Sequence, residues 1–380
     1  MARYNNAMNI LHVSPIQYSI NDNLSQGGTE RVVLNLNKEL ITKGVHSFVA
    51  CAKGSHLANS HFLADPLSLK VGDAPATYFT NAKDYESYFK KVIRTAIQNK
   101  VDLVHDHTGW LVLSEAYKTY CNEITLPILT TLAPCYPSEK KAKHYAEIKE
   151  KKKLYFCVVS KSQKQEFEDH LHIEEVIYNG IDFSTIPHPE TQPKKHYIFS
   201  LGRIAKWKGQ EVAITIARRA NKSLVVAGAI ADDEYFKQLT REKGLINKSG
   251  NISDFIISDS CNGIYYIGKL NDCQKYKWFG MAYCFVVPIL WDEPFGIVMI
   301  EAMACGTPVI AFNRGAAKEI ICNGKTGYVV DTEDQMIEAL NQINQIDPNY
   351  CRKWVEDNYS SQIMATRYLS LYQRIFGNDF

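Results

Sequence analysis

Short apolar runs rich in β-branched and aromatic residues alternate with longer amphipathic stretches along almost the whole chain. In the first half, the runs that predict strands are residues 10–13, 47–51, 102–105, 128–131 and 155–159. In the second half, they are residues 196–201, 223–227, 263–267, 283–287 and 308–311. Strands that are apolar throughout and separated by helices are typical of parallel sheets covered by helices on both faces. The pattern therefore predicts an α/β fold with two doubly wound, Rossmann-like parallel sheets.

The segment 183–195 (FSTIPHPETQPKK) separates the two sets of strands. Its three prolines disfavour regular secondary structure, so we interpret the segment as a linker. A chain of 380 residues is long enough for a domain on each side, and we expect domains at 1–187 and 188–358. Two doubly wound domains that face a common cleft would bind their ligand there, at the carboxyl ends of the strands.

Composition and charge narrow the class of protein. The formal net charge is +2, so nothing in the charge balance points to nucleic acid as a partner. Ten cysteines without a C-x-x-C pair are typical of reduced thiols in a cytoplasmic protein. The first nine residues are polar and do not resemble a signal peptide, and the longest apolar stretch, 278–291, is too short to span a bilayer. We therefore expect a cytoplasmic protein.

Two glutamates eight positions apart, Glu293 and Glu301, flank the start of a predicted helix in the segment EPFGIVMIEAMACG. The N-terminus of a helix has unpaired N–H groups that bind phosphate. Two carboxylates beside such a site suit a ligand with hydroxyl groups at both ends and phosphate between them. A nucleotide sugar is such a ligand, whereas the alternative is an amphipathic helix with solvated glutamates.

The segment resembles the E-x7-E motif of retaining glycosyltransferases with the GT-B fold, in particular family 4 (glycosyl transferases group 1). The resemblance continues through residues 306–311 (GTPVIA) and Glu319, and it is densest between 197 and 330. It implies two Rossmann-like domains facing a cleft and a last helix, within 359–380, that returns to the first domain. It also implies transfer of a sugar from a nucleoside-diphosphate sugar. Two departures are residues 228–231 (GAIA), where the family has Gly-x-Gly, and Ala316, where it often has a second glycine.

The resemblance assigns roles in the second half of the chain. Arg203 and Lys208, in a G-R-x-x-x-x-K-G segment, would hold the donor diphosphate and stabilise the charge that develops on it. Glu301 would accept hydrogen bonds from the ribose, and Glu293 from a hydroxyl group of the transferred sugar. The remaining donor-binding candidates are Lys269 and Leu270 near the nucleobase, and Phe295, Gly296 and Ile297 at the start of the helix.

In the first half, the paired glycines Gly27 and Gly28 would let backbone N–H groups approach an anion, and the resemblance implies that this turn closes over the donor phosphates. The segment 102–107 (DLVHDH) ends a predicted strand. Two histidines beside an aspartate would also suit a metal, but no third ligand is obvious, and a structural histidine is the common alternative. The resemblance favours His107 as the residue that reaches the donor sugar, with His105 buried in the strand.

Metal independence has separate support, because the sequence contains no Asp-x-Asp pair, which holds a divalent cation in the other large glycosyltransferase fold. Arg203, Lys208 and helix dipoles would supply the positive charge instead. We therefore expect no metal and no cofactor other than the nucleotide-sugar donor. The resemblance also implies retention of configuration, without Glu293 as a covalent nucleophile.

The sequence says less about the donor and acceptor molecules than about the type of reaction. We expect a UDP-sugar as donor, with GDP-mannose as the next choice, and a saccharide or lipid-linked saccharide as acceptor. The basic segment 138–153 has seven lysines and three glutamates, so it would suit peripheral contact with an anionic membrane, or a solvated helix face. The alternative functions are a nucleotide-sugar epimerase and a catalytically silent sugar-nucleotide-binding relative. A nicotinamide dehydrogenase is disfavoured because no G-x-G-x-x-G follows a strand.

Overall fold

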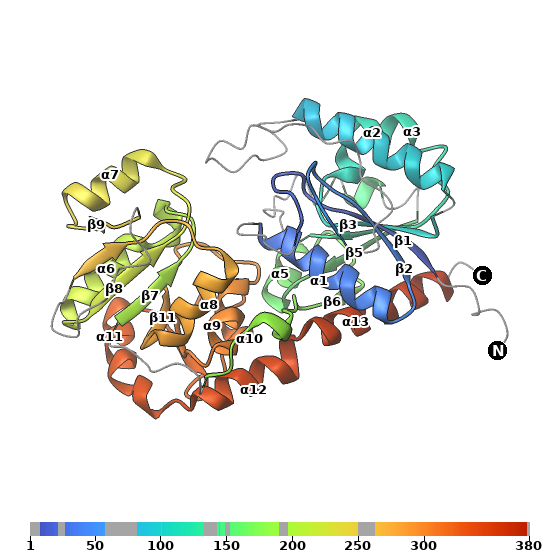
Figure 1. Cartoon of the computed structure of the whole chain (residues 1–380). Coiled ribbons are helices and arrows are strands. Elements are labelled where there is room, and N and C mark those ends of the chain that lie inside the picture. Colours follow the sequence, from blue (N-terminus) through green and yellow to red (C-terminus); the bar gives the residue numbers. More distant parts are fainter. Residues whose placement is uncertain are drawn as a thin grey trace. The chain divides into compact units, whose positions relative to one another are not determined.

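The computed structural model describes residues 8–21, 27–57, 82–99, 101–132, 143, 145–148, 153–189, 197–249 and 263–377. Most of the basic segment 138–153 and the end of the predicted linker lie outside these residues. The chain divides into two compact units (Figure 1). Unit 1 comprises Met1–Gly180 and Ser361–Phe380, and unit 2 comprises Ile181–Ser360. Each unit contains one parallel sheet, which confirms the predicted fold class.

The sheet of unit 1 has six strands in the order β2-β1-β3-β4-β5-β6, and all neighbours are parallel. The strands are β1 (Asn9–Val13), β2 (His46–Ala50), β3 (Leu103–Asp106), β4 (Ile128–Thr131), β5 (Leu154–Val158) and β6 (Glu175–Val176). The helices described in this unit are α1 (Gly28–Thr42), α2 (Ala82–Gln98), η1 (Leu111–Leu113), α3 (Glu115–Tyr120), α5 (Lys161–Phe167) and α13 (Ser361–Gly377).

The two faces of this sheet are covered by different helices, because successive side chains of a strand point to opposite faces. Leu11 and Val13 of β1 share a core with Tyr88 and Phe89 of α2. Helices α1 and α13 contact each other, and Figure 1 shows them on the other side of the sheet from α2 and α3. His12 lies between Leu11 and Val13 in sequence and therefore points to the α1 and α13 side.

The sheet of unit 2 has seven strands in the order β13-β12-β11-β7-β8-β10-β9, again with parallel neighbours. The strands are β7 (Tyr197–Leu201), β8 (Ser223–Ala227), β9 (Ile246–Asn247), β10 (Ile264–Tyr266), β11 (Cys284–Val287), β12 (Val309–Phe312) and β13 (Gly327–Val330). The helices described in this unit are η2 (Phe183–Thr185), η4 (Lys206–Lys208), α6 (Gln210–Arg219), α7 (Asp233–Arg241), α8 (Asp272–Met281), α9 (Ile297–Ala304), α10 (Ala317–Ile320), α11 (Glu333–Gln342), η5 (Ile343–Gln345) and α12 (Pro348–Tyr359).

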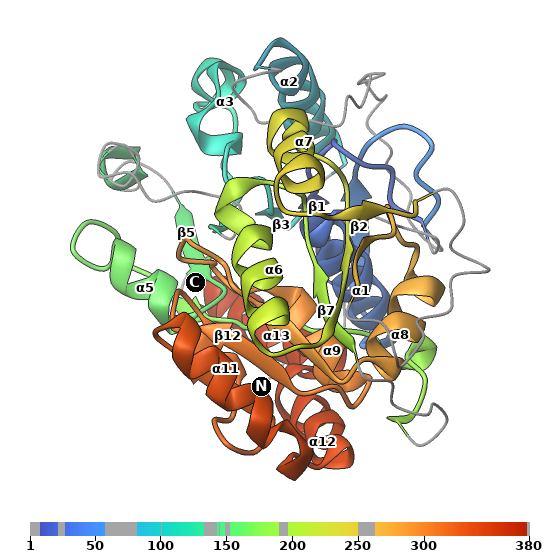
Figure 2. The same cartoon turned by 90° about the vertical axis from the view of Figure 1, so that its left-hand side faces the viewer.

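The core of unit 2 is also two-sided. Ile198 and Val226 of the sheet pack with buried residues of α6, α7 and α11, which face the viewer in Figure 2. On the other face, the rings of Phe199 of β7 and Phe285 of β11 both contact Phe279 of α8 edge-on, and they are tilted relative to each other. The strands of both units are thus buried on both faces, which explains their continuous apolar runs.

The chain passes between the units at two points, after Gly180 and after Ser360. Ile181 and Ser360 form an isolated parallel β-bridge, and the N–H group of Ile181 donates to the carbonyl oxygen of Tyr359 (3.0 Å). The first and the last residues of unit 2 therefore lie side by side. Among the helices that the structure describes, none is long and apolar enough to cross a bilayer.

Candidate active site

Both sheets have a point at which the chain changes direction across the sheet, and ligands of doubly wound folds bind there. In unit 2 this point lies between β7 and β11, because β8, β9 and β10 lie on one side and β12 and β13 on the other. In unit 1 it lies between β1 and β3. Lys208 follows β7, Glu293 follows β11, and His107 follows β3, so predicted residues lie at both points.

An ion pair joins the two loops at the switch point of unit 2. Lys208, the last residue of η4, places its Nζ 2.6 Å from Oε2 of Glu293. The two side chains are 16% and 20% exposed, so solvent or a ligand can reach both groups. The ammonium group also lies 5.3 Å from the centre of the Trp291 ring. Two of the predicted site residues are thus in direct contact.

Glu301 is in a second ion pair, deeper in the same unit. It lies in α9, and its Oε1 accepts a hydrogen bond from Nζ of Lys275 in α8 at 2.6 Å. Nζ of Lys275 is also 3.0 Å from Oδ1 of Asp272. The side chain of Glu301 is only 3% exposed, so its carboxylate depends on this lysine for charge compensation. Each of the two predicted glutamates therefore has its own lysine.

Other predicted residues of unit 2 differ in what they can offer to a ligand. Arg203 is partly exposed, and its side chain makes no hydrogen bond or ion pair with the residues that the structure describes. Lys269 is exposed, whereas Leu270 is buried. Phe295 is buried against the ring of Tyr359, with the ring centres 5.9 Å apart, which leaves its backbone as the part that can face a ligand.

Three helices begin directly after a glycine in the left-handed conformation and have no side-chain cap. They are α1 after Gly27, α6 after Gly209 and α9 after Gly296, with φ of 95°, 72° and 84°. Six other described α-helices have a side-chain cap, which is provided by Ser114, Ser160, Asp232, Asn271, Thr332 and Asp347. In these first turns, the N–H group of Glu211 in α6 donates to the hydroxyl group of Tyr235 (3.0 Å), and that of Glu30 in α1 donates to its own carboxyl group. The remaining N–H groups can bind an anion, and the three helices follow β1, β7 and β11.

The structure explains the first departure from the family pattern. Gly228 has φ of 136°, and a Cβ atom there would lie 2.0 Å from the carbonyl oxygen of Gly202, so a glycine is required. Two positions later, Ile230 forms a β-bridge with Ile204. A second glycine is not needed there, because the backbone at Ile230 is paired with the loop after β7.

The second departure has a similar cause. Gly315 has φ of 52°, and a Cβ atom there would lie 2.2 Å from the carbonyl oxygen of Glu293. The next residue, Ala316, has φ of −79° and donates its N–H to the same carbonyl oxygen at 3.0 Å. Alanine is compatible with that conformation, and the pair Gly315–Ala316 holds the backbone of Glu293 in place.

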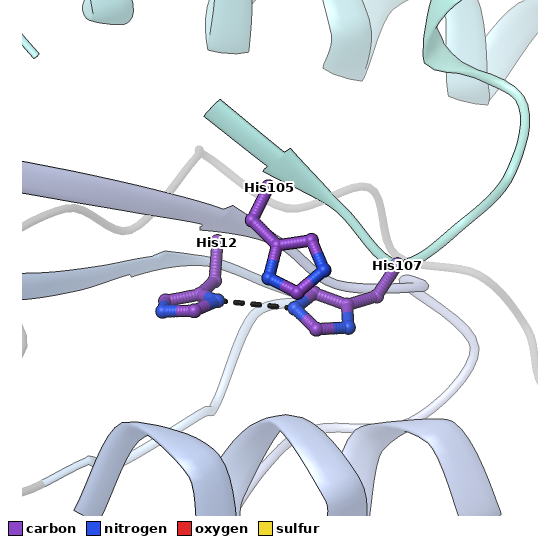
Figure 3. Close-up of side chains that lie close together, drawn as sticks. All are labelled: His12, His105 and His107. Carbon is purple, nitrogen blue, oxygen red and sulfur yellow. Dashed lines mark hydrogen bonds between the residues drawn. The ribbon is translucent and has the colours of Figure 1, made fainter. Parts of the chain in front are cut away.

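Three histidines lie together at the switch point of unit 1 (Figure 3). His12 of β1, His105 of β3 and His107 just after β3 are all buried. Nδ1 of His12 is 3.0 Å from Nε2 of His107, while His105 is bound at Nδ1 by the hydroxyl group of Tyr372 and at Nε2 by that of Thr131, both at 2.7 Å. Burial lowers the pKa of all three, to about 3 for His12, so the imidazoles are neutral.

The cluster also has the spacing of a metal site, since one ring nitrogen of each histidine lies within 4.8 Å of the others. Metal ligation needs a free lone pair on each ligand. Both nitrogens of His105 already have hydroxyl partners, and Nδ1 of His12 is hydrogen-bonded to Nε2 of His107, so the three histidines do not offer three free lone pairs to a metal. The hydrogen-bond partners therefore favour a structural role for His105.

Asp106, between the two histidines, fixes the turn that follows β3. Its carboxylate accepts hydrogen bonds from the N–H (2.8 Å) and hydroxyl (2.6 Å) groups of Thr108 and from the N–H of Leu111 (3.1 Å). Burial raises its pKa to about 6 despite these bonds. The position of His107 is thus set by a turn whose hydrogen bonds are made within the chain.

Glu30 lies in the first turn of α1, beside Gly27. It is buried, and burial raises its pKa to about 8, although the backbone N–H groups of Glu30 and Tyr18 donate to the carboxyl group. Glu30 is therefore mainly neutral at pH 7, and it does not cancel the positive end of the helix dipole at the Gly27–Gly28 turn.

Two families match the chain. The family described as Glycosyltransferase Family 4 matches residues 26–185, and the family described as Glycosyl transferases group 1 matches residues 260–361. Together these matches cover well over half of the sequence, and they include Gly27, His107, Glu293 and Glu301. The chain belongs to the family 4 glycosyltransferases. It is an enzyme of the hexosyltransferase class.

Known proteins are similar to this glycosyltransferase over almost all of the 380 residues. An uncharacterized 41.2 kDa protein in the cps region of Klebsiella pneumoniae is 22% identical, and the match covers 96% of this chain and 99% of that protein. Sucrose-phosphate synthase from Thermosynechococcus elongatus has a TM-score of 0.72 at 19% identity, covering 97% of this chain and all of the other. HepE of Anabaena, in complex with UDP and glucose, has a TM-score of 0.68 at 16% identity, covering 96% and 99%. These likenesses confirm the GT-B fold.

The structure places three further residues in or near the predicted site of this glycosyltransferase, and the sequence patterns did not indicate them. They are His12, Trp291 and Lys275. His12 interrupts an apolar strand, and Lys275 lies among aromatic residues on the buried side of α8. A polar residue at a position that the periodicity predicts to be buried is the signal that would have found both.

Gly315→Ala is expected to reduce both the stability and the turnover of this glycosyltransferase. The left-handed conformation alone costs about 1–2 kcal/mol for a residue with a Cβ atom. The contact with the Glu293 backbone adds to that cost and displaces Glu293, which should lower turnover on the order of tenfold to a hundredfold. Thermal melting and steady-state kinetics of the variant measure the two effects.

Gly324→Ala is the matched control, because Gly324 has φ of 74° and no atom would lie within 4 Å of its Cβ. It should lose stability but keep its turnover. Equal turnover in the two variants would show that the Gly315 contact does not position Glu293.

Proposed function

We propose that this glycosyltransferase transfers a sugar, with retention of anomeric configuration, from a nucleoside-diphosphate sugar to a saccharide or lipid-linked saccharide. The observation that carries the proposal is the Lys208–Glu293 ion pair at the switch point of unit 2, between the uncapped starts of α6 and α9. It combines a cation, a hydrogen-bond acceptor and free N–H groups. A diphosphate joined to a sugar needs all three.

The positively charged residues at this site suit a reaction in which a nucleoside diphosphate is the leaving group. Cleavage of the bond between the anomeric carbon and phosphate leaves negative charge on the diphosphate, and fixed cations stabilise it. Lys208 and Arg203 are the two cations. The guanidinium group of Arg203 has no ion-pair partner among the described residues, so it can bind phosphate without first breaking such a pair. We propose that these cations and the helix N-termini serve in place of a metal ion.

The two glutamates have different tasks in this proposal. Glu301 uses Oε1 for Lys275, and Oε2 has no partner among the described residues, so it can accept hydrogen bonds from the ribose. Glu293 accepts from a hydroxyl group of the transferred sugar once the diphosphate attracts Lys208. The acceptor attacks on the face that the diphosphate leaves, and the diphosphate takes the acceptor proton, so Glu293 forms no covalent bond.

The favoured donor is a UDP-sugar, with GDP-mannose as the next choice. HepE, a structural neighbour, was solved with UDP and glucose, which supports uracil as the base. We place the enzyme in the cytoplasm, where the free thiols of its described cysteines would stay reduced. We further propose that the basic segment 138–153 makes peripheral contact with a membrane.

The test is release of nucleoside diphosphate from a panel of UDP-, GDP- and ADP-sugars in the presence of EDTA. We expect slow hydrolysis of one donor that is unaffected by EDTA and is reduced on the order of 10²–10³-fold in Arg203→Ala. Loss of activity with EDTA would contradict metal independence. No release and no thermal shift with any nucleotide would favour a silent sugar-nucleotide-binding relative.

Two further readouts complete the test. The anomeric configuration of the product, followed by proton NMR, separates retention from inversion. A glycosylated peptide that contains Glu293, found by mass spectrometry after incubation with donor alone, would replace the proposed front-face reaction by a covalent one.

A further inference from the structure

The histidine cluster contains a hydrogen bond whose direction can be worked out. Nδ1 of His12 and Nε2 of His107 are 3.0 Å apart, which is the length of an N–H···N hydrogen bond. A neutral imidazole has one N–H donor and one lone pair. One of these two nitrogens therefore carries the proton and the other accepts it.

The other nitrogen of His12 decides between the two directions. Nε2 of His12 is buried and has no hydrogen-bond partner among the described residues. If Nε2 carried the proton, a buried N–H group would have no acceptor, which is rare in folded proteins. A proton on Nδ1 leaves only a lone pair at the buried Nε2, and the N–H group without a described partner then lies on Nδ1 of His107, which, unlike Nε2 of His12, is not among the fully buried side-chain atoms that lack a partner. His12 therefore donates from Nδ1 to Nε2 of His107.

This direction fixes the state of His107. Because Nε2 accepts, the proton of neutral His107 is on Nδ1. Nδ1 makes no hydrogen bond with the described residues, and Figure 3 shows it on the side of the ring that points away from His12. His107 thus has one N–H group available for a ligand and no free lone pair.

The ring of His105 holds the other two in place. Its centre is 3.8 Å from that of His107 and 5.4 Å from that of His12, and its own nitrogens are bound by Tyr372 and Thr131. Rotation of either neighbouring ring is therefore restricted by a ring that is itself fixed. The tautomer of His107 is set by contacts within unit 1.

We propose that His12 is a positioning residue that fixes His107 as a hydrogen-bond donor through Nδ1, so that His107 binds a hydroxyl oxygen of the donor sugar and does not act as a base. The inference rests on the proposed function and deepens it. A histidine that only donates agrees with a reaction in which the leaving diphosphate takes the acceptor proton.

The experiment is NMR of the full chain labelled with ¹⁵N-histidine. Protonated and unprotonated ring nitrogens have distinct shifts, and the His107 signals are assigned by their loss in His107→Asn. We expect Nδ1 of His107 to be protonated and Nε2 unprotonated at pH 7. The opposite assignment in the folded protein, or a stoichiometric metal bound to the ring nitrogens, would overturn the proposal.

Two substitutions at one position separate hydrogen bonding from packing. His12→Asn keeps an N–H donor near the place of Nδ1, whereas His12→Leu fills the space without one. In His12→Leu, the His107 tautomer should change or average, and turnover should fall on the order of tenfold to a hundredfold. His12→Asn should keep the wild-type tautomer and most of the activity.

The outcomes distinguish this inference from the proposed function. Equal losses in both variants, at similar melting temperatures, would show that His12 acts by packing alone. If no donor in the panel reacts, the proposed function fails, but the NMR assignment still decides the tautomer. If a donor reacts and the tautomer is the opposite one, only this inference fails.

Discussion

Lys275→Met is expected to destabilise unit 2 by about 3–5 kcal/mol, because it leaves the carboxylate of Glu301 buried without its partner. The side chains of Lys275 and Glu301 are 10% and 3% exposed, and their ion pair measures 2.6 Å. The measurement is urea unfolding followed by fluorescence. The nucleotide affinity should fall as well, because Glu301 would lose its fixed orientation.

Two controls make this result specific. Lys277→Met removes an exposed lysine from the same helix and should change stability by less than about 0.5 kcal/mol. The double variant Lys275→Met/Glu301→Gln removes both charges and should recover much of the stability but not the activity. If the double variant is no more stable than Lys275→Met, the loss comes from packing and not from the unpaired carboxylate.

Lys208→Met is expected to lower turnover on the order of 10²–10³-fold, because it removes one of the two cations that we propose stabilise the leaving diphosphate. Its effect on stability should be small, since Lys208 and Glu293 are both partly exposed and solvent screens their interaction. Steady-state kinetics with the donor identified in the panel measures the change, and a fall in kcat larger than the rise in KM indicates a role in the transition state.

Lys206→Met provides the matched control for this variant. Lys206 is the first residue of η4, is exposed, and makes no ion pair with the described residues. It should keep turnover close to that of the wild type. Similar losses in both variants would mean that general positive charge in the loop matters, and not the position of Lys208.

The sequence predicted the parallel sheets well because their strands are buried on both faces. The runs 128–131 and 223–227 agree with β4 and β8 at both ends, since a buried parallel strand is apolar along its whole length. The strands β6 and β9 were missed because each has two residues and none of them is buried, so no apolar run marks them. β13 was missed because it starts at Gly327 and has two partly exposed residues in its centre.

The sequence predicted those residues of the candidate site that belong to short local motifs. Lys208 and Glu293 lie 85 positions apart, and only the family resemblance brought them together before the structure showed their contact. Lys275 and His12 act on Glu301 and His107 through contacts made by folding, and no spacing within one helix or strand indicates such contacts. The predicted roles of all these residues remain to be tested by the substitutions proposed above.

The last helix of the chain has a consequence for how the protein is made. Unit 2 is continuous in sequence, so all of it has been synthesised when residue 360 is added. Unit 1 lacks α13 at that moment, and with it Tyr372, which holds His105 in the histidine cluster. Domains generally fold as units during synthesis. A chain cleaved between Ser360 and α13 would therefore keep all of unit 2 but would lack the hydroxyl group that holds His105 in unit 1.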